Sequence, residues 1–192
     1  TNIALMHTWL CDATDQASTL GDAVAAQLDR DGDIAEYNSP TYDAISLMAG
    51  CVLADFGRTA TVRQLGEQSI RLICSRLHEV WHPGFALQAG PHVRSYGLDP
   101  HLYVSLMSVL MAAIDVPAAG PTRLDNNTTH VHDLYFLPLF TRLCARLRKA
   151  FTVQPVVEPR RHEQQFDGIV ATSIMEPNNA IGFEHGRRHR FA

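Results

Sequence analysis

The residues His78-Glu79-Val80-Trp81-His82 match the HExxH pattern of zinc peptidases. In that class two histidines one helical turn apart bind zinc, and the glutamate acts as a base on the metal-bound water. Pro83 follows directly and disfavours helical backbone at His82, so the second ligand would lie on a fraying last turn. His92 or Asp99 could supply a third ligand. A zinc metallopeptidase using His78, His82 and Glu79 is therefore kept as an alternative to a helix end with incidental histidines.

A glycine-flanked segment at residues 89–99 places His92, Arg94 and Tyr96 at alternating positions. In extended backbone these three side chains point to one side. Imidazole, guanidinium and phenol groups together recognise anions and transfer protons. A loop that is packed by Tyr96 and satisfied by local hydrogen bonds explains the same pattern, so both interpretations stay open.

Glu36, Tyr37 and Asn38, with Tyr42, form a polar and aromatic segment just before an expected helix. Unpaired N–H groups at a helix start favour a bound anion. Glu36, Tyr37 and Tyr42, together with Asp99 at the end of the 89–99 segment, are therefore candidate substrate-binding residues, and Asn38 is a candidate catalytic residue.

A second candidate binding segment, residues 129–135, carries His130, His132, Asp133 and Tyr135. The two histidines could pair on a metal, yet their spacing favours an exposed turn. Zinc at the HExxH pattern is the alternative cofactor, and the preferred interpretation assigns no metal and no cofactor.

Composition limits the class of protein. The chain has 192 residues, 46% hydrophobic and 19% charged, with a formal net charge of -4. These values suit one soluble globular domain and exclude a disordered chain or a coiled coil. No apolar run approaches the ~20 residues that span a bilayer, and the mild acidity argues against nucleic-acid binding through a general positive field. We therefore expect neither a membrane nor a nucleic acid as partner.

Apolar side chains recur at helical spacing through the first three quarters of the chain. Helices are expected to end near Gly32, to span 40–57, 60–82 and 100–114, and to begin again at Pro138 with Leu139, Leu143 and Leu147 inward. After Phe151, short β-branched clusters separated by Pro, Gly and Asn indicate strands. The expected organisation is a helical domain at 1–150 and a β-rich or extended segment at 151–192 that begins a second domain.

Four cysteines, Cys11, Cys51, Cys74 and Cys144, lie far apart in apolar stretches, which favours buried thiols over disulfides. Two overlapping glycosylation sequons at Asn126 and Asn127 matter only for a secreted chain. No targeting segment is visible, so cytoplasmic and secreted locations are both compatible, and the oligomeric state stays open.

Four segments together resemble a known family: EYNSPTYD at 36–43, WHPG at 81–84, AGPHVRSYGLD at 89–99 and GFEHGRR at 182–188. They are similar to uncharacterised, mainly fungal and bacterial proteins that resemble the (α/α) toroid domain of heparinase II/III-type polysaccharide lyases. The resemblance runs from about residue 20 to 190. It implies a mainly α fold of antiparallel helix pairs around a cavity, followed by a β-domain. A full toroid needs more helices than the chain offers, so a fragment or a reduced relative is expected.

The resemblance also implies a chemistry, the β-elimination of an acidic, uronate-containing saccharide. Asn38 or Arg94 would hold the uronate carboxylate, which stabilises the developing enolate. His92 or Tyr96 would act as base, and Tyr96 or Tyr42 as acid. A carbohydrate-active enzyme of this kind is the preferred function. The zinc metallopeptidase and a non-catalytic helical module that binds a ligand or partner are the alternatives.

Overall fold

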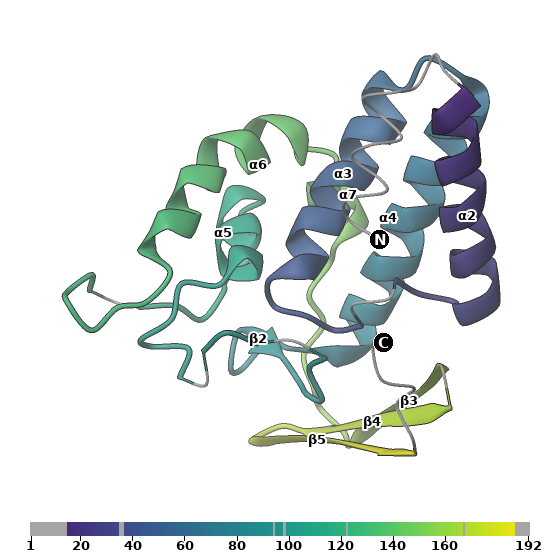
Figure 1. Cartoon of the computed structure of the whole chain (residues 1–192). Helices are drawn as coiled ribbons and strands as arrows, with labels where there is room; N and C mark the ends of the chain where they lie inside the picture. The colour runs from purple at the N-terminus through teal and green to yellow at the C-terminus, as the bar shows by residue number, and fades with distance from the viewer. Residues whose placement is uncertain are drawn as a thin grey trace.

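The computed structural model describes residues 15–34, 37–93, 95–97, 99–121, 123–166 and 168–186. Figure 1 shows α2, α3 and α4 side by side, α5 and α6 next to them, and a three-stranded sheet beyond the end of α4. The helices are α2 (Asp15–Asp31), α3 (Tyr42–Phe56), α4 (Ala60–Val80), α5 (Leu106–Ala113), α6 (Leu137–Leu143), α7 (Leu147–Ala150) and the 3-10 helix η1 (Val131–Phe136). The strands are β1 (Trp81–His82), β2 (Leu87–Gln88), β3 (Arg160–Phe166), β4 (Ile169–Glu176) and β5 (Asn179–Gly186).

The fold is a small mixed α and β domain, so the expectation of a mainly α, toroid-like array of helix pairs is wrong. Within the described residues, six α-helices and one 3-10 helix accompany two antiparallel sheets, of two and three strands. After α4 the helices shorten to eight, seven and four residues in α5, α6 and α7. Helices this short do not build the successive long pairs that a toroid requires. Loops and the β1–β2 hairpin occupy much of the chain between them.

Helices α3 and α4 pack against each other through two glycines. A Cβ atom on Gly66 would lie 2.6 Å from the carbonyl oxygen of Gly50 and 2.5 Å from the amide nitrogen of Ala54. A Cβ atom on Gly50 would lie 3.1 Å from Cγ1 of Ile70. The missing side chains therefore allow the two helix backbones to approach closely. Both helices contribute many buried residues to the main hydrophobic core.

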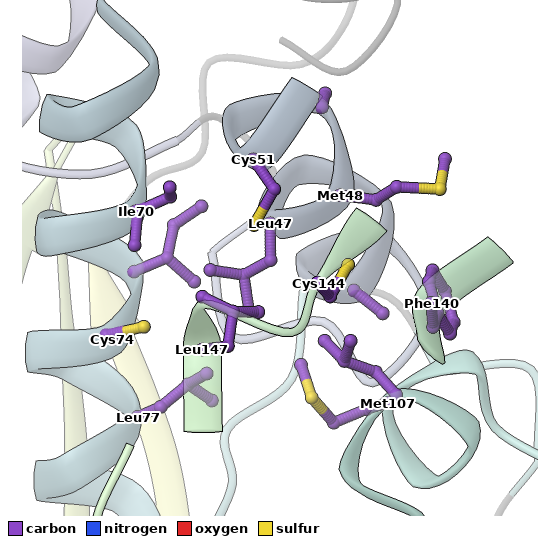
Figure 2. Packing of buried hydrophobic residues seen from close by; sticks show 14 of the residues in the cluster. Leu47, Met48, Cys51, Ile70, Cys74, Leu77, Met107, Phe140, Cys144 and Leu147 are labelled. Atoms are coloured by element: carbon purple, nitrogen blue, oxygen red, sulfur yellow. The ribbon is translucent and has the colours of Figure 1, made fainter. Parts of the chain in front are cut away.

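The main hydrophobic core lies between α2, α3, α4, α5, α6 and α7. Figure 2 shows Leu47 and Cys51 of α3 facing Ile70 and Leu77 of α4, with Leu147 beside them. Buried side chains elsewhere in this cluster include Cys74, Met107, Phe140 and Cys144. Cys51, Cys74 and Cys144 are free buried thiols, as predicted, while Cys11 lies outside the described residues.

Several element ends differ from the sequence expectation. The helix expected over 60–82 ends at Val80, because Trp81 is already extended and pairs with Gln88 in a two-stranded hairpin. The helix expected from Pro100 begins only at Leu106, where the Ser105 hydroxyl accepts a hydrogen bond from the amide of Ser108. Residues 101–105 therefore form a loop, from which Tyr103 and Ser105 line a pocket.

The inward face of the last helices also differs from the prediction. Phe140 is fully buried in α6, whereas Leu139 is 46% exposed. Leu147 is buried as expected, but it belongs to the separate short helix α7. The sequence predicted one continuous helix, but the chain forms two short helices separated at Cys144. In α6 the buried residue is therefore Phe140 and not its neighbour Leu139.

Three strands lie between residues 160 and 186, within the segment expected to be β-rich or extended. Strands β3, β4 and β5 form an antiparallel meander in which β4 is central. The sheet packs on residues 81–91: the His82 ring donates to the carbonyl of Glu176, and the Ser173 hydroxyl donates to the carbonyl of Gly90. Ala89, Val156 and Met175 form a small apolar cluster at the same place. The sheet therefore braces the loop that follows α4.

None of the helices in the described part of the chain combines the length and the apolar character needed to cross a membrane.

The close approach of α3 and α4 predicts a large effect of one methyl group. We expect Gly66→Ala to lower the free energy of unfolding by about 2 kcal/mol, because overpacking outweighs the ~1 kcal/mol gain in helix propensity. Gly120→Ala is the matched control, since no atom lies within 4 Å of its added Cβ. Urea denaturation of both variants measures the difference, and equal stabilities would contradict the glycine contact.

Candidate functional site

A buried ion cluster centres on Arg76, which points from α4 into the protein. The guanidinium forms two 2.9 Å hydrogen bonds to Asp43 and a salt bridge to Asp33. The side chains of Arg76, Asp33 and Asp43 are 2%, 3% and 0% exposed. Arginine is rarely buried unless it is paired, and its planar fork suits bidentate contact with carboxylates. The cluster therefore ties α4 to the segment between α2 and α3 and to α3 itself.

Two amide side chains complete this ion cluster. The Gln88 amide donates to Asp43 Oδ2 and to Asn38 Oδ1, each at 2.9 Å. The Asn38 amide donates in turn to the carbonyls of Ala89 and Pro91, at 2.7 and 2.9 Å. Asn38 is fully buried, and both ends of its amide are occupied. The predicted role of Asn38 as a carboxylate-binding residue therefore competes with its role in the cluster.

Burial shifts the ionisation of this cluster. Desolvation raises the pKa of Asp43 to about 6, although Arg76 partly opposes it. Desolvation also raises the pKa of Tyr37, whose ring lies 5.0 Å from the Arg76 guanidinium, to about 12. Burial lowers the pKa of Arg76, but the two aspartates outweigh it and raise the pKa above its usual range. Tyr37, predicted to bind substrate, is 1% exposed and belongs to the cluster.

Beside the ion cluster lies a pocket of about 170 Å³. It is lined by the β1–β2 hairpin, the loop after it and the start of α5. Two lining residues are joined by a hydrogen bond from the Met107 amide to the Pro40 carbonyl. The apolar lining includes Trp81, Leu87, Met107 and Pro100, and the polar lining includes His92, Tyr103, Ser105 and Ser108. The structure thus assigns His92, one of the predicted catalytic residues, to a concave site.

The His92 ring contacts the main chain of Gln88. Its Nε2 lies 3.2 Å from the Gln88 carbonyl oxygen. A carbonyl oxygen only accepts hydrogen bonds, so Nε2 carries the proton and, in the neutral ring, Nδ1 carries the lone pair. Burial lowers the pKa of His92 from its ordinary value of 6.5. The ring is therefore neutral and basic at neutral pH.

A group of tyrosines and histidines lies next to the pocket. The Tyr103 hydroxyl contacts Thr41 Oγ1 at 2.7 Å, and the hydroxyls of Tyr42 and Tyr96 also lie 2.7 Å apart. The rings of Tyr96 and Tyr103 pack on His130 at 5.3 and 5.2 Å. Burial raises the pKa of Tyr103, which keeps its phenol protonated. Tyr42, Tyr96 and His130, all predicted site residues, are thus brought together.

The predicted binding residues His130 and Asp133 cluster with His132. His130 Nδ1 lies 3.6 Å from Asp133 Oδ2, and His132 Nε2 lies 3.4 Å from Asp133 Oδ1. The Asp133 side chain is 8% exposed, and its desolvation raises its pKa against the opposing effect of His132 and His130. Tyr135, two residues further on, is 82% exposed and stands apart from this cluster.

The HExxH residues do not share one helical face. His78 lies on α4, stacks on Phe151 and accepts a hydrogen bond from the amide of Thr152. His82 lies in β1, where Nδ1 accepts from the amide of Phe85 and Nε2 donates to the carbonyl of Glu176. Both nitrogens of His82 are therefore occupied by backbone groups, a geometry that favours a structural role over zinc binding. Glu79 is exposed.

The remaining predicted site residues are Glu36, Arg94 and Asp99. Glu36 and Arg94 lie outside the described residues. Asp99 is exposed, and its carboxylate accepts a hydrogen bond from the amide of His101 within a turn.

Sequence reasoning missed the residues that organise the site. Arg76 lies at helical spacing from Ser69, Ile73 and Val80, all buried. A charged residue on an apolar helical face indicates a buried partner of opposite charge, and this signal was available in the sequence. Tyr103 and Gln88 carried no comparable signal, because their roles depend on loops whose paths the sequence does not specify.

Comparison with known proteins identifies one family. The chain belongs to a family described as a domain of unknown function, DUF8769, whose model matches residues 7–145. The ion cluster, the pocket and the His130–Asp133 cluster all lie within the matched residues, whereas the three-stranded sheet lies beyond them. Neither a curated protein nor a solved structure matches the chain.

The ion cluster predicts a large loss of stability when its cation is removed. We expect Arg76→Met to lower the free energy of unfolding by about 3–5 kcal/mol, because two buried carboxylates lose their counter-charge. Arg71→Met is the control, since Arg71 is exposed on the same helix. Chemical denaturation compares the two variants. If Arg76→Met unfolds at the same denaturant concentration as Arg71→Met, the cluster contributes no stability.

The raised pKa of Asp43 predicts a pH dependence of stability. Its pKa is about 6 in the folded chain and near 3.8 when unperturbed. The folded state therefore holds the proton more tightly, and this contribution is complete below about pH 4 and lost as the pH rises through 6. The unfolding free energy of the wild type, relative to Asp43→Asn, should fall between pH 4 and pH 7. A constant difference across this range would show that Asp43 does not titrate as described.

Proposed function

We propose that the pocket beside His92 binds a small molecule and transfers a proton, with His92 as the general base. The carrying observation is the contact between His92 Nε2 and the Gln88 carbonyl, which leaves Nδ1 as the basic nitrogen of a ring that lines a cavity. A base held in one tautomer and kept neutral at working pH is suited to taking a proton from a bound molecule. Because Gln88 is fixed by the ion cluster, the ring has a rigid support.

The size of the pocket limits the ligand. A volume of about 170 Å³ is smaller than the ~300–1,000 Å³ of sites for drug-sized ligands. It suits one small molecule or a single unit of a longer chain. Trp81, Leu87 and Met107 offer an apolar wall for the carbon skeleton, while hydroxyl groups offer hydrogen bonds to its oxygens.

Tyr103 supplies the complementary group. Burial raises the pKa of this phenol, which contacts Thr41 and lines the same pocket as His92. A protonated phenol and a base that line the same pocket together support removal of a C–H proton next to a carbonyl group. His92 takes the proton, the C–H electrons move toward the carbonyl oxygen, and the phenol stabilises the charge that develops there.

Uronate β-elimination, implied by the sequence resemblance, is a narrower reaction of this class. Its support is the presence of His92 in the pocket and of Tyr96 with Tyr42 close by. Among the described residues that line the pocket, none is Lys or Arg, and Asn38 is committed to the ion cluster. The described lining therefore favours a neutral carbonyl compound over a uronate.

Deuterium exchange at carbon tests the proposal without knowledge of the later steps. The protein is incubated in D₂O with a panel of small ketones, aldoses and uronate-containing oligosaccharides, and mass spectrometry follows deuterium uptake and cleavage. We expect the wild type to label at least one compound and His92→Ala to lower the rate at least 100-fold, the ordinary range for loss of a general base. His101→Ala, an exposed histidine in the following loop, is the control and keeps the wild-type rate.

Absence of labelling across the panel, or full labelling by His92→Ala, would overturn the catalytic proposal. Ligand binding without labelling would favour the non-catalytic binding module instead.

The pH profile gives a separate check on His92. Because burial lowers its pKa below 6.5, the basic form persists into mildly acidic solution. The exchange rate should therefore fall only below pH 6.5 as the ring becomes protonated. An acidic limb centred above pH 6.5 would contradict this environment for His92.

A further inference from the structure

We propose that His130, His132 and Asp133 bind one divalent transition-metal ion. The three residues offer two imidazole nitrogens and a carboxylate oxygen that lie within 4.8 Å of one another. This inference does not depend on the proton-transfer function proposed for the pocket. Among the described residues, it is the one cluster of three or more metal-ligating side chains at this separation.

The distances between the ligand atoms suit a shared ion. Atoms about 2.1 Å from a tetrahedral metal lie roughly 3.4 Å from each other. The two histidine nitrogens lie 3.6 and 3.4 Å from the Asp133 oxygens. Both distances exceed the ~3.2 Å limit of a normal N–H···O hydrogen bond. The two nitrogens approach different oxygens of the Asp133 carboxylate, and one ligand atom from each of the three residues lies within 4.8 Å of the others, a separation that a shared ion can span.

The ligand types select the metal. Imidazole binds Zn²⁺, Co²⁺, Ni²⁺ and Cu²⁺ well, whereas Mg²⁺ and Ca²⁺ prefer oxygen ligands. Two histidines with one carboxylate therefore favour a transition metal. Three protein ligands leave at least one coordination position for water or a substrate, as in catalytic rather than structural sites.

The backbone brings the three residues together within one turn. His130 adopts left-handed backbone, with φ 59° and ψ 27°, a conformation that is uncommon for residues other than glycine. The amide of Asp133 donates to the His130 carbonyl, which closes the turn at the start of η1. The rings of Tyr96 and Tyr103 hold the His130 ring from two sides. Packing therefore fixes His130 in the orientation needed to share an ion with Asp133.

The site is anchored inside the protein and open outside. The Asp133 side chain is 8% exposed, while those of His130 and His132 are 29% and 69% exposed. The buried carboxylate supplies negative charge, and the exposed imidazoles leave a path for an ion to enter from solvent. Tyr103 contacts His130 and also lines the pocket, so the metal site adjoins the pocket proposed for a ligand.

Cobalt and zinc titrations test this site. Tag-free full chain is treated with a chelator, dialysed, and titrated with Co²⁺ while visible absorption is recorded, followed by competition with Zn²⁺. We expect one ion per chain, and at least 10-fold weaker binding for His132→Ala and for Asp133→Asn. His185→Ala removes an exposed histidine of β5 and should bind like the wild type. Because His132 is largely exposed, its variant should keep the wild-type melting temperature in the absence of metal.

The outcomes separate this site from the HExxH pattern. Zn²⁺ should raise the melting temperature of the wild type but not of His132→Ala, since only an ion bound to the native state stabilises it. His78→Ala should retain binding. Failure of the wild type to bind stoichiometrically, equal binding by His132→Ala, or loss of binding in His78→Ala alone would each overturn the proposal.

Discussion

The buried charge of Arg76 is the constraint on which the rest of the structure depends. A guanidinium removed from water needs ionic and hydrogen-bonding partners, and Asp33 and Asp43 supply them from two other segments. The two carboxylates exceed the single positive charge. The Gln88 amide donates one further hydrogen bond to Asp43, and Asn38 Oδ1 accepts from the same amide. One buried cation thereby joins the end of α2, the start of α3, α4 and β2.

The residues around β2 connect the ion cluster to the pocket. The side chain of Gln88 faces the ion cluster, while its main-chain carbonyl faces His92. Asn38 holds the next carbonyls, those of Ala89 and Pro91. From the other side, the three-stranded sheet contacts Gly90, where a Cβ atom on Gly182 would collide with its carbonyl group. The loop that carries His92 is therefore fixed from both sides, which is how a short loop can hold a base in one orientation.

The sequence predicted the parts of this fold that depend on local pattern. Helical spacing located α3 and α4, left-handed Gly32 follows α2, and β-branched clusters after Phe151 located the sheet. It also drew attention to His92, which lines the pocket, and to His130 and Asp133, which cluster. Each of these signals lies within a few residues of the feature that it predicts.

What the sequence did not predict depends on contacts between distant residues. Asp33 and Asp43 lie 43 and 33 positions from Arg76, and no local pattern pairs them. The toroid expectation failed because it extended the helix-pair pattern of α3 and α4 across the shorter helices α5, α6 and α7. Asn38 illustrates the same limit, since its residue type suits substrate binding and only the structure reveals that its amide is already occupied.

We infer that the ion cluster holds His92 as a neutral imidazole with its proton on Nε2. Nitrogen-15 NMR of histidine-labelled protein at pH 7 measures the tautomer directly. We expect a protonated Nε2 and an unprotonated Nδ1 for His92 in the wild type. In Arg76→Lys, where the bidentate contact with Asp43 is lost, we expect a mixture of tautomers. A proton on Nδ1 of the wild-type ring, or a doubly protonated ring at pH 7, would contradict this inference.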